Sequence, residues 1–247
     1  MDPRERFSQT VEDYRRYRPD YPEALFAWIG QTAALELGSV VVDIGCGTGI
    51  STRQLAGRGW RVIGVDPNEE MLEAAREDSG GVDVEYVRSD AETLALPLER
   101  CDAIVGGQAF HWFDLDRCLP RFRTLLSGGP VVAFWNLRDH ADPLMAAYEA
   151  LLKERCPEYV KVGAEPRAHA VAERFEGAER AFFPHHQTLD RDGFFGRVRS
   201  SSYVRNGVAD DRRESFDEAL GALFDAHADE GAVRFAYRTM AVAFQPG

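Results

Sequence analysis

Short apolar runs alternate with helical patterns along the chain between residues 40 and 136. The apolar runs are Val40–Ile44, Arg61–Asp66, Val84–Arg88, Asp102–Gly107 and Val131–Trp135. Runs of this length between turn residues are typical of buried strands, and the helical patterns between them supply the crossover connections of an α/β protein. We therefore expect parallel strands joined by right-handed crossovers, with their carboxyl ends at one edge of a sheet.

The alternation stops beyond Arg138, where the pattern changes. Residues 157–178 are mixed and poorly patterned. Around them, the sequence has helical patterns over residues 139–156, 191–200 and 212–229, and strand-like alternation over residues 181–187 and 233–244. The second half of the chain is therefore expected to add two strands and several helices to the sheet.

The first strand runs into a turn with glycine at every second position, Gly45, Gly47 and Gly49. Glycine has no Cβ, so main-chain N–H groups can approach a bound molecule closely and positive φ angles cost little. Asp43 is expected to point into the crevice at the carboxyl end of this strand, where open α/β sheets bind small polar ligands. A dinucleotide fingerprint, G-x-G-x-x-G, needs glycine where Ile50 stands, which argues against a nicotinamide dehydrogenase.

The acid-x-Gly-x-Gly-Thr-Gly pattern of residues 43–49 resembles the class I methyltransferases, which use S-adenosylmethionine. Three later strand ends match that family in order. Asp66 ends the second strand, Asp90 and Ala91 follow the third, and residues 108–113 follow the fourth. A carboxylate such as Asp66 can accept hydrogen bonds from both hydroxyls of a ribose. The resemblance therefore implies S-adenosylmethionine as the cofactor.

The resemblance also implies which side chains hold this cofactor. The turn after the first strand would hold the methionine part, the end of the second strand the ribose, the end of the third the adenine, and residues 108–112 the reacting end. The cofactor residues implied in this way are Tyr14, Arg18, Asp43, Gly45, Cys46, Gly47, Asp66, Pro67, Met71, Asp90, Ala91 and Gln108.

The fold that the resemblance implies is an α/β, Rossmann-like methyltransferase sheet of seven strands in the order 3-2-1-4-5-7-6, with strand 7 antiparallel and a helical cap. Residues 1–247 would form a single domain. Its parts would be residues 1–37 as an N-terminal lid and first helix, 38–137 as the cofactor-binding core, 138–231 as the cap with strand 6, and 232–247 as the last strand.

The N-terminal segment before the helix expected over residues 23–37 is rich in Tyr, Arg and Pro, and it looks like the opening of a bacterial small-molecule branch of the family, similar to trans-aconitate-type and natural-product methyltransferases. Fungal relatives of that branch act on carboxylic acids. Arg18 can clamp the carboxylate of the cofactor and Tyr14 can face its sulfonium. Alternatively, the tyrosines only attach the first helix to the domain, which is the interpretation we favour for Tyr21.

Methyl transfer from a sulfonium is an in-line displacement, so alignment of acceptor, methyl group and sulfur supplies much of the catalysis. A general base is needed only for an acceptor that arrives protonated, and His111 is the candidate. Trp112 is the second catalytic candidate, as an aromatic wall for the methyl cation, together with Phe113. Alternatively, His111 bonds to backbone or orients Trp112.

The candidate substrate-binding residues are Phe113, Asn136, Tyr203 and Arg205. Asn136 follows the fifth strand on the expected substrate side, whereas Tyr203 and Arg205 belong to a segment that resembles a substrate-side segment of the relatives. Tyr203 and Arg205 could bind an anionic substrate, although a surface salt bridge is the commoner role of an isolated arginine.

The composition narrows the choice of partners. A formal net charge of −12 without a long basic face argues against nucleic acid. No run approaches the ~18 apolar residues of a membrane span, and residues 1–6 do not form a signal peptide, so we expect a cytoplasmic protein, monomeric or homodimeric. The cysteines have no paired spacing, so neither a disulfide framework nor a metal site is expected; they are Cys46, Cys101, Cys118 and Cys156.

These patterns lead to one functional hypothesis with two alternatives. The chain is expected to transfer a methyl group from S-adenosylmethionine to oxygen or nitrogen of a small metabolite, for which an anionic one would suit Tyr203 and Arg205. Alternatively, the chain is a cofactor-binding regulatory module without catalysis, or it methylates an acceptor that a partner protein presents.

Overall fold

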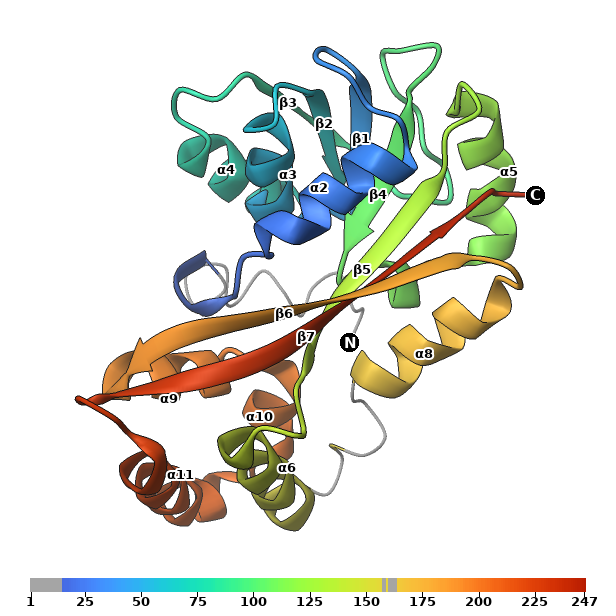
Figure 1. The fold of residues 1–247 in the computed structure, drawn as a ribbon. Coiled ribbons are helices and arrows are strands. Elements are labelled where there is room, and N and C mark those ends of the chain that lie inside the picture. Colours follow the sequence, from blue (N-terminus) through green and yellow to red (C-terminus); the bar gives the residue numbers. More distant parts are fainter. Residues whose placement is uncertain (1–14, 157–158, 160–163) are drawn as a thin grey trace.

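A computed structural model describes residues 15–156, 159 and 164–247 of the chain. Its centre is a seven-stranded sheet in the order β3-β2-β1-β4-β5-β7-β6 (Figure 1). The strands are β1 (Val40–Ile44), β2 (Arg61–Asp66), β3 (Val84–Arg88), β4 (Ala103–Gly107), β5 (Val131–Arg138), β6 (Glu179–Asp190) and β7 (Ala232–Phe244). β7 is antiparallel to both of its neighbours, whereas the pairings among β1 to β5 are parallel. The sequence prediction of a Rossmann-like methyltransferase sheet is confirmed, including strand order and the antiparallel last strand.

Helices cover both faces of this sheet. They are α2 (Glu23–Thr32), α3 (Ile50–Ala56), α4 (Glu69–Asp78), η2 (Phe110–Trp112), α5 (Leu115–Leu125), α6 (Pro143–Arg155), α8 (Ala164–Arg174), α9 (Arg191–Arg199), α10 (Ser202–Gly207), η3 (Asp210–Arg212) and α11 (Arg213–His227). One apolar core joins α2 and α3 to the sheet, and a second core joins α5 and α8 to the opposite face. None of the helices in the described ranges combines the length and the apolar character that crossing a bilayer requires.

A third apolar core lies apart from the first two, around the halves of β6 and β7 that extend beyond the central sheet (Figure 1). It contains Tyr148 from α6, Phe194 from α9, Leu220 from α11 and Phe235 from β7, all nearly or fully buried. These helices, with α10, form the predicted helical cap. The cap therefore has its own hydrophobic support, and β5 and the β6–β7 pair connect it to the cofactor side of the sheet.

Several helix boundaries differ from those expected. α2 ends at Thr32 instead of residue 37, because the chain turns at Ala34, which has a φ of 49°. α8 lies within the poorly patterned stretch 157–178, and its inward side is made of Ala168 and Ala172, whose small side chains give little hydrophobic signal. For the helical pattern of residues 115–126, Pro120 suggests a late start or a kink; α5 starts at Leu115 and includes Pro120 on its exposed side.

Candidate functional site

The backbone of the glycine turn brings β1 and α3 close to several other elements. Gly45, Gly47 and Gly49 have φ values of 72°, 54° and 75°, which favour glycine. A Cβ on Gly45 would lie 2.5 Å from Ala109 Cβ, and one on Gly49 would lie 2.3 Å from the Tyr86 hydroxyl. At Gly47 no heavy atom lies within 4 Å of that position. The turn is therefore packed on two sides and open at its middle glycine.

Asp43 supports this turn from behind. Its side chain is fully buried, and Oδ2 accepts hydrogen bonds from Ser51 Oγ at 2.8 Å and Thr52 Oγ1 at 2.7 Å. Burial raises the pKa of Asp43 to about 6, although the two hydroxyl donors oppose that rise. The carboxylate thus fixes the start of α3 instead of lining a pocket, which corrects the expectation that it points into the crevice. Its Oδ1 has no hydrogen-bond partner among the described residues.

Asp66 connects the glycine turn to the next helix. Its Oδ2 accepts a hydrogen bond from the Gly47 N–H at 3.0 Å, and its Oδ1 accepts one from the Asn68 N–H at 2.9 Å. Asn68 in turn caps α4 by accepting from Met71 N. Burial raises the pKa of Asp66 despite these donors. Each carboxylate oxygen still has a second lone pair, so Asp66 can organise the turn and accept further hydrogen bonds.

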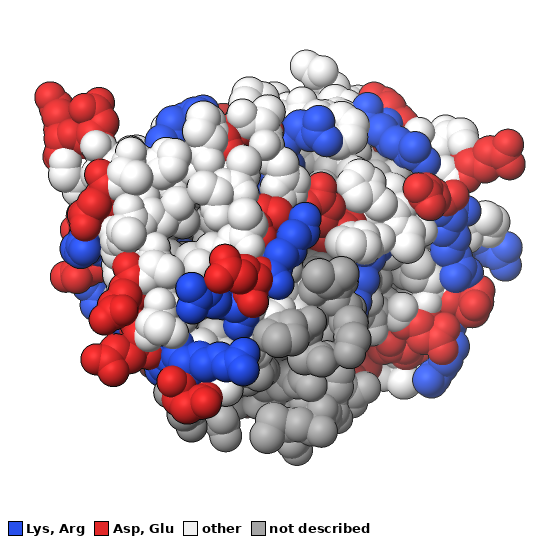
Figure 2. Space-filling view, turned by 90° about the horizontal axis from the view of Figure 1, so that it is seen from below, with Lys and Arg blue, Asp and Glu red and all other residues white. Residues whose placement is uncertain are grey.

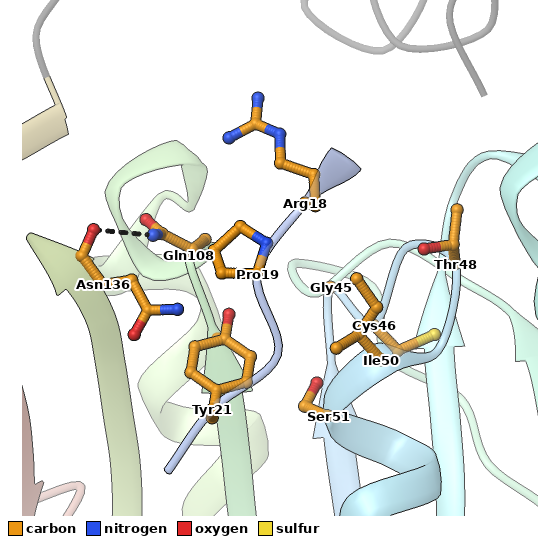
Figure 3. Close-up of a pocket in the computed structure, with 11 residues that line it drawn as sticks. Arg18, Pro19, Tyr21, Gly45, Cys46, Thr48, Ile50, Ser51, Gln108 and Asn136 are labelled. Atoms are coloured by element: carbon orange, nitrogen blue, oxygen red, sulfur yellow. Dashed lines mark hydrogen bonds between the residues drawn. The ribbon is translucent and has the colours of Figure 1, made fainter. Parts of the chain in front are cut away.

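The first pocket lies beside the glycine turn (Figure 3). The N-terminal segment from Arg18 to Tyr21 passes between the turn on one side and Gln108 and Asn136 on the other. Gln108 Nε2 donates to the Asn136 carbonyl at 3.2 Å, and Asn136 Nδ2 donates to the Asp20 carbonyl at 2.9 Å. These bonds hold the ends of β4 and β5 against the N-terminal segment.

A second pocket lies between the end of β5 and the cap. It shares Arg18, Gln108 and Asn136 with the first pocket, so the two pockets adjoin at these residues. Its walls carry four cationic side chains and two carboxylates, namely Arg18, Arg138, Lys153 and Arg197 with Glu149 and Glu165. The second pocket is therefore positively charged within a protein whose net charge is −12.

Arg138, at the end of β5, has its counter-charge inside the second pocket. Its Nη2 donates to Glu149 Oε2 at 2.8 Å and also contacts the Tyr159 hydroxyl, while Nη1 donates to the Tyr203 hydroxyl at 2.7 Å. Tyr159 also donates to Glu149 Oε2 at 2.6 Å. Burial alone would raise the pKa of Glu149, but the bonds from Tyr159 and Arg138 lower it overall. Arg138 and Glu149 thus form a half-buried, hydrogen-bonded ion pair.

Arg197, on α9, has no such counter-charge. It is 7% exposed, and its guanidinium donates to Tyr237 Oη at 2.7 Å and Ser201 Oγ at 3.1 Å. No carboxylate of the described residues forms an ion pair with it. Burial lowers the pKa of Arg197, but Tyr237 and Tyr203 more than offset this, so the guanidinium stays charged. The second pocket therefore contains a buried cation without an anion.

Comparison with known proteins assigns this arrangement to a family. Residues 42–134 match the family described as "Methyltransferase domain". Residues 42–134 thus form a methyltransferase domain. An uncharacterized methyltransferase of Schizosaccharomyces pombe is 30% identical over 154 residues, covering 61% of this chain and 59% of the relative. One from Mycobacterium tuberculosis is 37% identical over 134 residues, covering 54% and 53%.

The chain thus spans somewhat more than half the length of these curated relatives. A solved structure from Anaeromyxobacter dehalogenans, provisionally named a type II methyltransferase, superimposes with a TM-score of 0.71 at 28% identity. That match covers 93% of this chain and 98% of the other, so it includes the cap as well as the methyltransferase domain. The class I fold and its S-adenosylmethionine dependence, expected from the glycine turn and the strand ends, are confirmed.

The described residues fit S-adenosylmethionine, the cofactor of the class I methyltransferases. The open face at Gly47 leaves main-chain space for a ligand. Buried Thr48 Oγ1, which belongs to the first pocket, has no hydrogen-bond partner within the described ranges. Arg18, Gly45, Cys46 and Gln108 line the same pocket, as expected of cofactor residues. The methyltransferase domain therefore offers polar groups and open space where the family binds its cofactor.

The remaining cofactor candidates lie near this pocket but do not line it. Pro67 and Met71 are at the start of α4, and Asp90 and Ala91 follow β3, with Met71 and Ala91 buried. Together with Gly47 and Asp66 they surround the carboxyl ends of β1, β2 and β3, where an extended ligand would continue. Their contacts with the cofactor stay predictions. Tyr14 lies outside the described residues.

Neither catalytic candidate of the sequence analysis lines the two pockets. His111 Nδ1 accepts a hydrogen bond from Trp135 Nε1 at 3.2 Å, and burial together with the Arg167 charge lowers the pKa of His111 to about 4. Trp112 is 42% exposed, with the Arg167 guanidinium 5.2 Å from its ring centroid. His111 is thus placed as a structural hydrogen-bond acceptor, and Trp112 faces away from both pockets.

The substrate candidates divide in the same way. Asn136 and Tyr203 line the second pocket, whereas Phe113 packs against Gly45 and Phe110, and Arg205 lies on α10 outside the lining. The sequence analysis missed Arg138, Glu149, Tyr159, Arg197 and Tyr237. For Arg197 a signal existed: it adjoins Val198 and follows Phe194 by three residues, so helical spacing places it on the buried face of α9.

Proposed function

We propose that the chain transfers a methyl group from S-adenosylmethionine to oxygen or nitrogen of a small, anionic metabolite held in the second pocket. The observation that carries this proposal is that Arg18, Gln108 and Asn136 line both pockets, so that the two adjoin. When bound, the cofactor supplies a methyl group on a positively charged sulfur. The protein orients both molecules and excludes water, and such positioning can supply ~7–11 kcal/mol of a barrier.

The charge of the second pocket supports an anionic acceptor. A buried cation is costly unless it is paired, because burial removes its hydration. Arg138 meets this cost through Glu149, but Arg197 has only neutral hydroxyl partners among the described residues. A carboxylate or other anion of the acceptor would supply the missing counter-charge. Net negative charge elsewhere on the protein makes this cationic pocket the favourable place for a small anion.

For the cofactor, we propose the roles that the family resemblance implies. Asp43, Gly45 and Gly47 hold the methionine part, with Asp43 acting through the turn that it fixes, and Arg18 clamps its carboxylate. Asp66 accepts hydrogen bonds from the ribose, and Asp90 with Ala91 borders the adenine. In addition, Gln108, which belongs to both pockets, borders the reacting end.

We propose a small molecule as the partner, and neither nucleic acid nor membrane. On the face seen from below, basic and acidic side chains are interspersed, and the visible part has no continuous basic surface (Figure 2). A phosphate backbone needs such a surface for binding, since its affinity comes mainly from neutralised phosphates. This supports a metabolite acceptor held inside the protein, consistent with a cytoplasmic monomer or homodimer.

The test is incubation with methyl-labelled S-adenosylmethionine and a fractionated small-molecule extract, followed by mass spectrometry of the labelled product. We expect label in a small molecule that carries negative charge. Binding of S-adenosylhomocysteine, measured by calorimetry, should accompany it. Tight binding without any labelled product would contradict the enzymatic proposal and favour a cofactor-binding regulatory module or an acceptor presented by a partner protein.

A further inference from the structure

The second pocket contains a tyrosine in an unusual electrostatic position. Tyr203 lines this pocket from α10, and its hydroxyl oxygen accepts a hydrogen bond from Arg138 Nη1 at 2.7 Å. The Arg138 guanidinium also lies 5.7 Å from the Tyr203 ring centroid. Arginine can only donate hydrogen bonds, so this contact favours a phenolate oxygen over a phenol.

The groups around Tyr203 come from every element that packs near it. Beyond Arg138 on β5, they are Tyr148 and Glu149 on α6, Tyr159, Arg197 on α9 and Tyr237 on β7. Glu149 is bonded to Arg138 and Tyr159 and so is partly neutralised, whereas Arg197 has no carboxylate partner within the described ranges. The field at the Tyr203 oxygen is therefore positive.

The protonation of Tyr203 follows from this field. Burial raises the pKa of Tyr203, but Arg138 and Arg197 lower it by more, so that it reaches about 8. A phenol with this pKa is partly ionised at neutral pH, as an effective general base should be. By contrast, His111 lies outside both pockets, and its Nδ1 already accepts a hydrogen bond.

Building on the proposed methyl transfer, we propose that Tyr203 is the general base of the acceptor pocket and that the acceptor atom carries a proton before the reaction. The acceptor is then an anionic metabolite with an acidic hydroxyl or ring N–H group. Its oxygen or nitrogen gains a bond to the methyl carbon, while the electron pair of the carbon–sulfur bond leaves with the sulfur. The proton passes to the Tyr203 oxygen and from there to water.

Arg197 and Tyr203 act together in this assignment. An anionic group of the acceptor bound at Arg197 offsets part of the positive field and raises the pKa of Tyr203. A phenolate formed in the free protein therefore becomes a stronger base once the acceptor is in place. A simple carboxylate acceptor, already ionised at neutral pH, would need no such base.

The first test titrates the tyrosines of the protein alone by the ultraviolet difference absorbance of tyrosinate. The wild type should show one tyrosine with a midpoint near 8. Tyr203→Phe should lack it, and Arg197→Gln should shift it upward. Tyr86→Phe is the matched control, because Tyr86 bonds to Ser79, outside both pockets. A low midpoint that persists unchanged in Tyr203→Phe would overturn the assignment.

The second test uses methyl-labelled S-adenosylmethionine with the small-molecule extract. A methyl ether or N-methyl product keeps its label in mild alkali, as the proposal requires, whereas a methyl ester releases it and would overturn the base assignment. Tyr203→Phe should lower turnover by about 100-fold or more and abolish the rise in rate toward pH 8. An unchanged pH profile would contradict the proposal.

The two proposals can fail separately. S-adenosylhomocysteine should bind the wild type and Tyr203→Phe equally, since Tyr203 lines only the second pocket. Binding of S-adenosylhomocysteine together with an alkali-labile product would support methyl transfer and refute only the assignment of Tyr203 as the general base. Failure to bind S-adenosylhomocysteine would instead remove the proposed function itself.

Discussion

At the scale of single residues, Asp66 shows how one carboxylate serves both structure and binding. Both of its oxygens accept main-chain hydrogen bonds, from Gly47 and from Asn68, and so fix the glycine turn relative to α4. The same two hydrogen bonds fix the orientation of the carboxylate, and with it the directions in which its remaining lone pairs can accept. Its contribution to ligand binding therefore combines direct hydrogen bonds with preorganisation of the turn.

Replacing this carboxylate tests both contributions. Asp66→Ala should weaken S-adenosylhomocysteine binding by about 1–3 kcal/mol, because ribose hydroxyls and two main-chain N–H groups lose their acceptor. Calorimetry measures this loss. Glu85→Gln, at an exposed carboxylate on the neighbouring strand β3, should bind like the wild type. Equal affinities for Asp66→Ala and the wild type would refute the ribose assignment.

Arg138 and Arg197, both in the second pocket, should respond differently to the same replacement. Arg138→Met removes the nearer ion-pair partner of Glu149 and leaves it only Lys153, at 3.4 Å, so it should lower the free energy of unfolding by about 2–3 kcal/mol. Arg197→Met removes a buried charge that has no carboxylate partner among the described residues, so stability should change by less than about 1 kcal/mol while methylation is lost. Urea unfolding and product labelling measure these effects. A strongly destabilised Arg197→Met would contradict the view that Arg197 serves the ligand.

His111 gives a prediction for acid stability. Its pKa is about 4 in the fold and ~6.5 in an unfolded chain, so below pH ~6.5 the unfolded form binds a proton that the folded form does not. Stability from this group is thus present above pH ~6.5 and falls by up to about 3 kcal/mol as the pH drops toward 4. His111→Gln, which can still accept from Trp135, should lack this loss.

Urea unfolding of both proteins at pH 7 and at pH 4.5 separates the two cases. Asp43 titrates in the opposite sense, because its raised pKa lets the folded form bind a proton first, and it is present in both proteins. The difference between them therefore isolates His111. A difference that does not change with pH would show that His111 titrates alike in the folded and unfolded forms, and would contradict a lowered pKa.

At the scale of elements, helices and strands with strong hydrophobic periodicity could be predicted from the sequence, whereas those with weak periodicity could not. The five parallel strands were predicted close to their observed bounds, since their apolar positions are large and often β-branched; β5 differs most, because it ends at Arg138 instead of Trp135. α8 was missed because Ala168 and Ala172 form its buried side. β6 is longer than the predicted strand 181–187, because the residues that it adds at its two ends, 179–180 and 188–190, are mostly polar and give no hydrophobic alternation.

The residues of the candidate site also divide into those that the sequence could predict and those that it could not. Residues at the ends of strands beside the glycine turn could be predicted, since the adjoining sequence determines their positions. The second pocket instead joins β5, α6, α9, α10 and β7, whose relative placement depends on the packing of the cap. Arg138, Glu149 and Arg197 therefore meet for reasons that no local pattern contains. The catalytic roles of His111 and Trp112 stay predictions; His111 bonds to Trp135 on β5, and the Trp112 ring lies against Arg167 on α8.

At the scale of the whole molecule, a short N-terminal strap, residues 15–21, connects the sheet to the cap. Gln54 bonds to both main-chain groups of Tyr21 on the sheet side. On the cap side, the Tyr17 ring packs on α9 at Gly196, and Arg18 donates to the Ser200 carbonyl at 3.4 Å. Arg18 of this strap borders both pockets, so its position couples the cap to the cofactor side.

Gly196→Ala should release this strap. The new Cβ would lie 2.2 Å from the Tyr17 ring, while alanine itself favours α9 by about 0.5–1 kcal/mol. We expect unchanged or higher helix stability, weaker S-adenosylhomocysteine binding and faster proteolysis near Tyr17. Gly221→Ala on α11 is the control, since its Cβ would approach the flexible end of Arg191 at 3.1 Å and lie at ordinary contact distance, 3.8 Å, from Phe195. Unchanged ligand affinity in Gly196→Ala would show that the strap does not contribute to the site.

The separate apolar core of the cap has a consequence for engineering. The cap helices pack on the outer halves of β6 and β7, away from the two apolar cores that stabilise the central sheet. Directed evolution can therefore vary the pocket-facing positions of α6, α9 and α10 without loosening the glycine turn. The chain is in this sense a modular scaffold, in which acceptor choice and donor binding can be selected in separate libraries and then recombined.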